Sequence, residues 1–124
     1  MSVLVKIGLI ELAFGGLLGW PVALYTYVDP HALRRFGVAV PRRVFQAHLD
    51  FIMMGLILIG IGLALPALPG WLLVPLIAGT WLNPALLLLL AFSDDLLQAP
   101  AYRVLGVLSF AATSGSLVAV AIAA

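Results

Sequence analysis

The chain contains four apolar stretches, each long enough to cross a lipid bilayer, which takes roughly 20 residues. They lie at about 3–28, 43–65, 71–92 and 104–123. Only helices and closed barrels satisfy their backbone groups in hydrocarbon, and runs that are continuously apolar rather than alternating indicate helices. Only 9% of the residues are charged, against about 25% in a soluble domain. The sequence therefore predicts an all-α membrane protein, with one domain over residues 1–124 that forms a four-transmembrane-helix bundle in a lipid bilayer.

The connections between these stretches predict how the helices are arranged. Residues 66–70 read Pro-Ala-Leu-Pro-Gly, a tight turn of helix-stopping residues, so the second and third helices should form an antiparallel hairpin. Loops 29–42 and 93–103 hold most of the charge, and the segment 29–43 has four arginines and one aspartate. By the positive-inside rule, both loops are expected in the cytoplasm and both termini outside. We expect a multi-pass protein of the bacterial inner membrane.

Glu11 is an acidic residue inside the first apolar stretch. Glu11, Gly15 and Gly19 share one helix face, because they are spaced four residues apart. Glycines at this spacing are typical of close helix packing in membranes, so Glu11 should turn towards another helix. An acid within the membrane is a candidate functional group; the alternative is that Glu11 reaches the interface or pairs with Lys6. Pro21 should kink this helix near its end.

His48 lies near the start of the second apolar stretch. Helical periodicity places it on one face with flat aliphatic residues and glycines, namely Ile52, Gly55, Ile59 and Gly62, whereas Asp50 and Met54 point to nearly the opposite side. This face would suit a large planar cofactor with its metal on His48. The alternative is a histidine hydrogen-bonded at the membrane boundary, with glycines that serve helix packing.

Asn83 and Trp81 lie near the middle of the third apolar stretch. A buried amide needs hydrogen-bond partners, and Pro84 leaves the carbonyl of Thr80 without its helical donor. Asn83 could repair that local defect, or Asn83 and Trp81 could line a pocket. In the last stretch, residues 113–116 (Thr-Ser-Gly-Ser) are small enough for close helix packing and can bond back to their own helix.

Few cofactor chemistries are compatible with these residues. The chain has no cysteine, which excludes disulfides, thiolate ligands and iron–sulfur clusters, and no basic stripe indicates nucleic-acid binding. Zinc takes about three or four ligands together, but His48, Asp50 and Glu11 are the only candidates in the apolar stretches, and helical geometry separates the first two. A cofactor that needs one axial imidazole is compatible, and haem is the commonest such group.

Two sequence elements resemble a family of small membrane enzymes. The segment His48-Leu49-Asp50-Phe51-Ile52-Met53-Met54-Gly55 resembles the H-L-E/D-x-x-M-N-G element of hydroxylaminobenzene mutases and the corresponding H-x(5)-N-G element of styrene oxide isomerases. The segment Gly79-Thr80-Trp81-Leu82-Asn83 is similar to the G-T-Y/W-x-N of the mutases and the G-W-x-N of the isomerases. The order, the spacing and the tight turn between the two helices also agree.

The resemblance implies a cofactor, an assembly and a reaction. The styrene oxide isomerases are homotrimers with haem b between neighbouring subunits, which implies His48 as the axial iron ligand. On the predicted face, Ile52 and Gly55 would lie against the haem. Trp81 and Asn83 would lie in or beside the substrate pocket. In the family, ferric iron acts as a Lewis acid on a small apolar epoxide and converts it to an aldehyde without net redox change.

The chain departs from the family at two polar positions. Met54 stands where the family has an asparagine before the glycine, and Leu87 stands where the isomerases have a tyrosine. Three functions therefore stay open. The chain is a haem-b isomerase or mutase acting on an epoxide or N-aryl hydroxylamine, a haem-binding membrane protein without that catalysis, or a cofactor-free helical accessory subunit.

Overall fold

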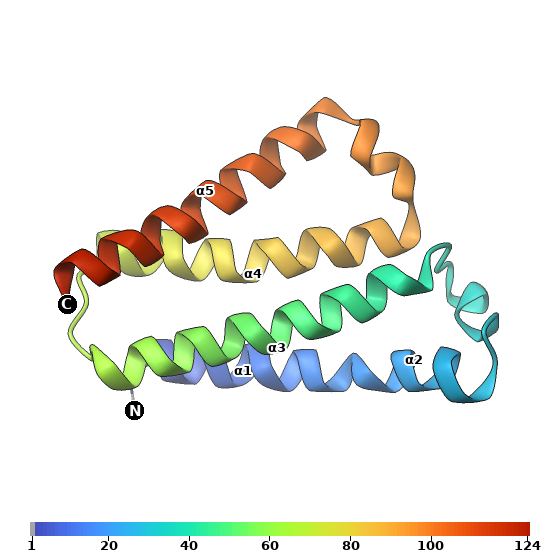
Figure 1. Cartoon of the computed structure of the whole chain (residues 1–124), viewed down its shortest axis with the longest axis horizontal. Coiled ribbons are helices and arrows are strands. Elements are labelled where there is room, and N and C mark those ends of the chain that lie inside the picture. The colour runs from blue at the N-terminus through green and yellow to red at the C-terminus, as the bar shows by residue number, and fades with distance from the viewer. Residues whose placement is uncertain (1) are drawn as a thin grey trace.

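The computed structural model describes residues 2–124, and these form helices joined by short connections (Figure 1). Four helical segments are long and apolar enough to cross a membrane, as the hydropathy predicts. The elements, in order, are α1 (Val3–Leu17), α2 (Gly19–Ala23), the π-helix η1 (Leu24–Val28), the 3₁₀ helix η2 (Ala32–Phe36), α3 (Pro41–Ala64), α4 (Gly70–Phe92), the 3₁₀ helix η3 (Asp94–Gln98) and α5 (Pro100–Ala123).

The long helices lie antiparallel, each packed on the next in the order α1, α3, α4, α5. The short turn between α3 and α4 makes them the predicted hairpin. Both chain ends lie at one end of the bundle, and the two charged connections lie at the other (Figure 1). The predicted grouping of both charged loops at one end of the bundle is therefore confirmed, and the side of the membrane that this end faces stays a prediction. At the charged-loop end α5 diverges from α4, and η3 bridges the opening between them.

Glycines bring α1 into very close contact with α3. A Cβ atom added to Gly55 would lie 2.8 Å from the carbonyl oxygen of Gly8 and 2.8 Å from the amide nitrogen of Leu12. A Cβ atom on Gly15 would lie 2.8 Å from the Cβ of Phe51. Because the neighbouring atoms belong mostly to the backbone, the two helix axes can approach this closely only where the side chain is a hydrogen atom.

The first transmembrane segment is interrupted rather than simply kinked. Its regular helix ends at Leu17, a short helix restarts at Gly19, and the last turn is a π-helix from Leu24. Pro21 has no N–H and cannot donate to the carbonyl of Leu17, which explains a break one turn before the proline. The prediction of a distortion caused by Pro21 is thus confirmed. The π-helical turn that follows it was not predicted.

Polar contacts connect the start of α3 with the end of α4 at the charged-loop end. The amides of Ala39 and Val40 both donate to the carbonyl of Ala91, each over 2.9 Å. The guanidinium of Arg43 is 3.2 Å from the carboxylate of Asp94. These contacts join the start of α3 to the end of α4, so the two charged connections form one connected surface.

Candidate functional site

His48 is held in one orientation by the first helix. Its Nδ1 atom is 2.6 Å from the carbonyl oxygen of Gly15. A carbonyl only accepts hydrogen bonds, so Nδ1 is the donor, and in the neutral ring the lone pair is then on Nε2. Gly19 lies against the ring: a Cβ atom there would be 3.1 Å from Cε1 of His48. The side chain is half-buried, and the arrangement matches that of metal-ligating histidines, which donate their second ring nitrogen to a carbonyl or carboxylate.

The glycine face below His48 is covered by α1. Gly55 is buried against Gly8 and Leu12, and Ile52 packs beside Gly15. Gly62 is likewise buried, against Val5. A planar cofactor cannot lie over Gly55 on this face unless α1 moves away. Within one protomer, the glycines predicted as a cofactor surface serve helix packing.

A cavity with three polar side chains in its lining lies on the other side of α3. It has a volume of about 330 Å³ and is lined by residues of α3, α4 and α5: Asp50, Met54, Asn83, Leu86, Leu87, Tyr102, Gly106 and Phe110. Asp50 and Met54 share this side of the helix, as the periodicity predicts. Met54 and Leu87, the two positions that depart from the family pattern, face the same cavity as Asn83.

Asn83 is fixed by hydroxyl groups of α5. Its Nδ2 donates to Oγ1 of Thr113 over 3.1 Å, and its Oδ1 accepts from Oγ of Ser109 over 2.5 Å. Thr113 in turn donates to the carbonyl of Ser109 over 3.0 Å. Both of these bonds go to α5, so Asn83 makes no direct hydrogen bond to the carbonyl of Thr80 among residues 2–124; repair of the Pro84 defect through a water bridge stays a prediction. The amide has a second N–H donor that this network leaves unused.

Hydroxyl groups on α4 and α5 also bond within their own helices. Thr80 donates to the carbonyl of Leu76 over 2.8 Å. Ser116 donates to the carbonyl of Ala112 over 2.5 Å and is buried with Thr113. The predicted back-bonding is therefore confirmed for the three hydroxyl residues of 113–116, and helix packing for Thr113 and Ser116, whereas Ser114 and Gly115 are exposed.

Trp81 belongs to a different cluster from Asn83. Its ring centroid is 5.9 Å from that of Phe51 and 6.5 Å from that of Phe14. Phe14 and Phe51 are themselves 4.7 Å apart in an edge-to-face arrangement. This aromatic cluster joins α1, α3 and α4, and Trp81 does not line the Asp50 cavity. The two residues predicted to share a pocket thus point to different places.

Glu11 is completely buried, at 0% exposure. Among residues 2–124 neither of its carboxylate oxygens has a hydrogen-bond partner, whereas Lys6 is exposed. The prediction that Glu11 turns towards another helix is confirmed, and the alternative of interfacial exposure or pairing with Lys6 is wrong.

Two features of the cavity escaped the sequence analysis. Tyr102 donates its hydroxyl proton to the carbonyl of Leu86 over 2.7 Å and so brings a phenol to the cavity wall. A tyrosine beside Arg103, at the start of an aliphatic helix, is the signal that could have indicated it. Asp50 was expected on nearly the opposite face from His48, but it was not predicted to share a cavity with Asn83 and Tyr102.

The chain offers single ligands rather than a metal cage. Residues 2–124 contain no group of three or more His, Cys, Asp or Glu side chains that could together hold a metal ion. His48 and the Asp50 cavity face different neighbours, α1 in one case and α5 in the other. No protein-family model, curated protein or solved structure matches this chain.

Proposed function

We propose that this chain binds haem b through His48 and isomerises a small apolar substrate, an epoxide or an N-aryl hydroxylamine, in the membrane. The observation that carries the proposal is the hydrogen bond from Nδ1 of His48 to the carbonyl of Gly15. In the neutral form of this half-buried ring, the bond places the lone pair on Nε2, and one such nitrogen is all that an axial haem ligand requires. The resemblance of residues 48–55 and 79–83 to the isomerases and mutases gives the same assignment.

Haem bound there would supply a Lewis-acidic iron that polarises the C–O or N–O bond of the substrate without net redox change. The Asp50 cavity supplies the protein groups for this reaction. Its volume of about 330 Å³ suits a small molecule, and Met54, Leu87 and Phe110 make part of its wall apolar. Asn83 is held rigidly by α5 and can offer its second N–H to a substrate oxygen.

Asp50 and Tyr102 support this use of the cavity. The family's amide and phenol are replaced here by Met54 and Leu87, so these two positions no longer offer polar groups. Asp50 and Tyr102 bring a carboxylate and a phenol to the same cavity from other positions. We therefore propose Asp50 as a further proton-accepting group beside Asn83, and Tyr102 as a hydrogen-bonding group.

The separation of His48 from this cavity supports a shared site. Within one protomer α3 stands between them, since His48 contacts α1 and Asn83 contacts α5. A site that uses both is completed only where His48 of one protomer meets the cavity of a neighbour. We therefore propose a homotrimer with haem between subunits. Light scattering with size-exclusion chromatography should give a trimer mass in mild detergent; a monomer that retains both haem and activity would contradict this arrangement.

The visible spectrum tests haem binding. Purified protein, reconstituted with hemin, should show a Soret band that His48→Ala abolishes. His31→Ala is the matched control, because His31 is an exposed loop residue, and it should leave the band unchanged. If the wild type stays colourless after hemin is added, the haem proposal fails and the cofactor-free accessory role takes its place.

A product assay tests the reaction separately. Aryl and alkyl epoxides should give aldehydes that gas chromatography detects, and N-aryl hydroxylamines should give rearranged aminophenols. Asn83→Ala should lower kcat with haem still bound. Haem binding without product from any substrate would identify the chain as a haem-binding membrane protein without this catalysis.

A further inference from the structure

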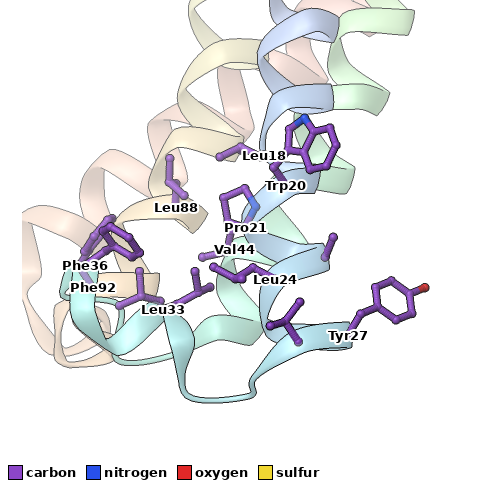
Figure 2. A pocket seen from close by; sticks show the side chains of 13 residues that line it. Leu18, Trp20, Pro21, Leu24, Tyr27, Leu33, Phe36, Val44, Leu88 and Phe92 are labelled. Carbon is purple, nitrogen blue, oxygen red and sulfur yellow. The ribbon is translucent and has the colours of Figure 1, made fainter.

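A large cavity lies at the charged-loop end, away from both His48 and the Asp50 cavity. Its volume is about 700 Å³, within the usual range of about 300–1,000 Å³ for small-molecule sites. It is bounded by the interrupted end of the first transmembrane segment, by η2, and by the ends of α3 and α4 (Figure 2).

The walls of this cavity are almost entirely apolar. Leu18, Pro21, Leu33, Val44 and Leu88 form its centre, and aromatic side chains stand at its edges (Figure 2). Apart from tyrosine and tryptophan tips, every lining side chain is apolar. Trp20 and Tyr27 are 75% and 85% exposed, and such residues concentrate where the membrane meets water. The cavity thus opens at the depth where a lipid headgroup joins its acyl chains.

Positive charge adjoins the cavity on η2. Leu33 and Phe36 line the cavity and are three residues apart, so they share one side of this 3₁₀ helix. Arg34 and Arg35 lie between them in the chain and are exposed. Among residues 2–124 neither guanidinium has an ion pair or hydrogen bond, in contrast to Arg43, which pairs with Asp94. Long arginine side chains can reach along an apolar surface and keep their charge in the interface.

We propose that this cavity binds one acyl chain of an anionic phospholipid, with the lipid phosphate on Arg34 and Arg35. The apolar walls would pack against an acyl chain. The two unpaired arginines would favour a negatively charged headgroup, since phosphate accepts charge-assisted hydrogen bonds from guanidinium. The break at Pro21 and the π-turn of η1 create the space. The proposal does not depend on haem binding.

Native mass spectrometry of the detergent-purified protein tests the site. The protein is titrated with phosphatidylglycerol and, separately, with phosphatidylcholine of the same acyl chains. We expect one phosphatidylglycerol per protomer, bound more tightly than phosphatidylcholine. Replacing both Arg34 and Arg35 with Gln should weaken phosphatidylglycerol binding about 30-fold. The control replaces Lys6 and Arg42 with Gln, which changes the net charge equally and should leave binding unchanged.

A second pair of measurements locates the acyl chain. Ala23→Trp places a large side chain inside the cavity and should abolish binding of both lipids. If that variant does not fold, the milder Ala23→Leu takes its place and should weaken the binding of both lipids. A phospholipid with a brominated acyl chain should quench the fluorescence of Trp20. The quenching should therefore disappear in the Trp20→Phe variant. Equal affinity for the two lipids, an equal loss in the Lys6 and Arg42 control, or unchanged binding by a folded Ala23 variant overturns the proposal. A changed oligomer mass without any change in lipid binding overturns it too, and identifies the cavity as a contact between copies of the chain.

Discussion

Replacing Gly55 with alanine should force α1 away from α3. The added methyl group would lie 2.8 Å from two backbone atoms of α1, the carbonyl oxygen of Gly8 and the amide nitrogen of Leu12. Neither atom can rotate away, so the helices themselves must separate. Gly60 offers a matched control on the same helix, because a Cβ atom there meets nothing within 4 Å.

The comparison isolates the effect of the close contact. Both substitutions gain the same helix propensity, up to about 1 kcal/mol for Gly to Ala, so this gain cancels between them. Overpacking a tight contact costs typically about 1–3 kcal/mol, and a clash with backbone belongs at the upper end. We therefore expect Gly60→Ala to be neutral or slightly stabilising, and Gly55→Ala to lie about 2–3 kcal/mol below it in the free energy of unfolding.

Unfolding by sodium dodecyl sulfate in mixed micelles, followed by far-ultraviolet circular dichroism, measures this difference on the haem-free protein. Equal stability of the two variants would refute the close α1–α3 contact. If Gly55→Ala leaves the haem-free protein unchanged but weakens hemin binding, then Gly55 belongs to the cofactor surface that the helix periodicity suggested. The experiment thus separates the two roles of this glycine.

Further predictions address the buried acid, the amide network, the ion pair and the topology. Glu11→Met should raise the free energy of unfolding by about 1–3 kcal/mol, because it removes a buried polar group without a partner; a loss of stability would indicate that Glu11 has a partner in the assembled protein. Asn83→Leu should lower stability by about 1–3 kcal/mol, since two hydroxyl partners on α5 lose their bonds, whereas Ser114→Ala, at an exposed site, should change it by less than about 0.5 kcal/mol. Breaking the Arg43–Asp94 pair by Arg43→Ala should cost less than about 1 kcal/mol, and less at high salt; a larger, salt-independent loss would contradict its exposed position. A periplasmic reporter enzyme fused to the C-terminus should be active in bacteria if the arginine-rich loop 29–42 is cytoplasmic, and inactive if the topology is reversed.

The helices and their order could be predicted because they depend on local properties. Continuous apolar runs determine which residues span the membrane. The Pro-Ala-Leu-Pro-Gly turn is so short that α3 and α4 must lie antiparallel as a hairpin. The shared face of Glu11 and Gly15 also follows from spacing alone. These features need no knowledge of which helix lies opposite.

The site could be predicted only in part, because periodicity gives a face of a helix but not its neighbour. The face with His48 and Gly55 is the smoothest on α3, which suits a planar cofactor and an adjacent helix equally well. In the structure α1 occupies it. Asn83 bonds to α5 for the same kind of reason: the rotation of α4 relative to α5 decides its partners. The joint cavity of Asp50 and Tyr102 depends on three helices at once, and no single stretch of sequence contains that information.

Both chain ends lie at the same end of the bundle (Figure 1), and this has a practical consequence for counting subunits. A chain with an even number of spans returns to the side from which it started, so a water-soluble linker can join the C-terminus of one copy to the N-terminus of the next without crossing lipid. Two or three copies can therefore be encoded as a single polypeptide. In such a concatemer His48→Ala can be placed in one copy and the Asp50 cavity altered in another. The activity of each combination would then count how many complete sites an assembly contains, and from which copies their parts come.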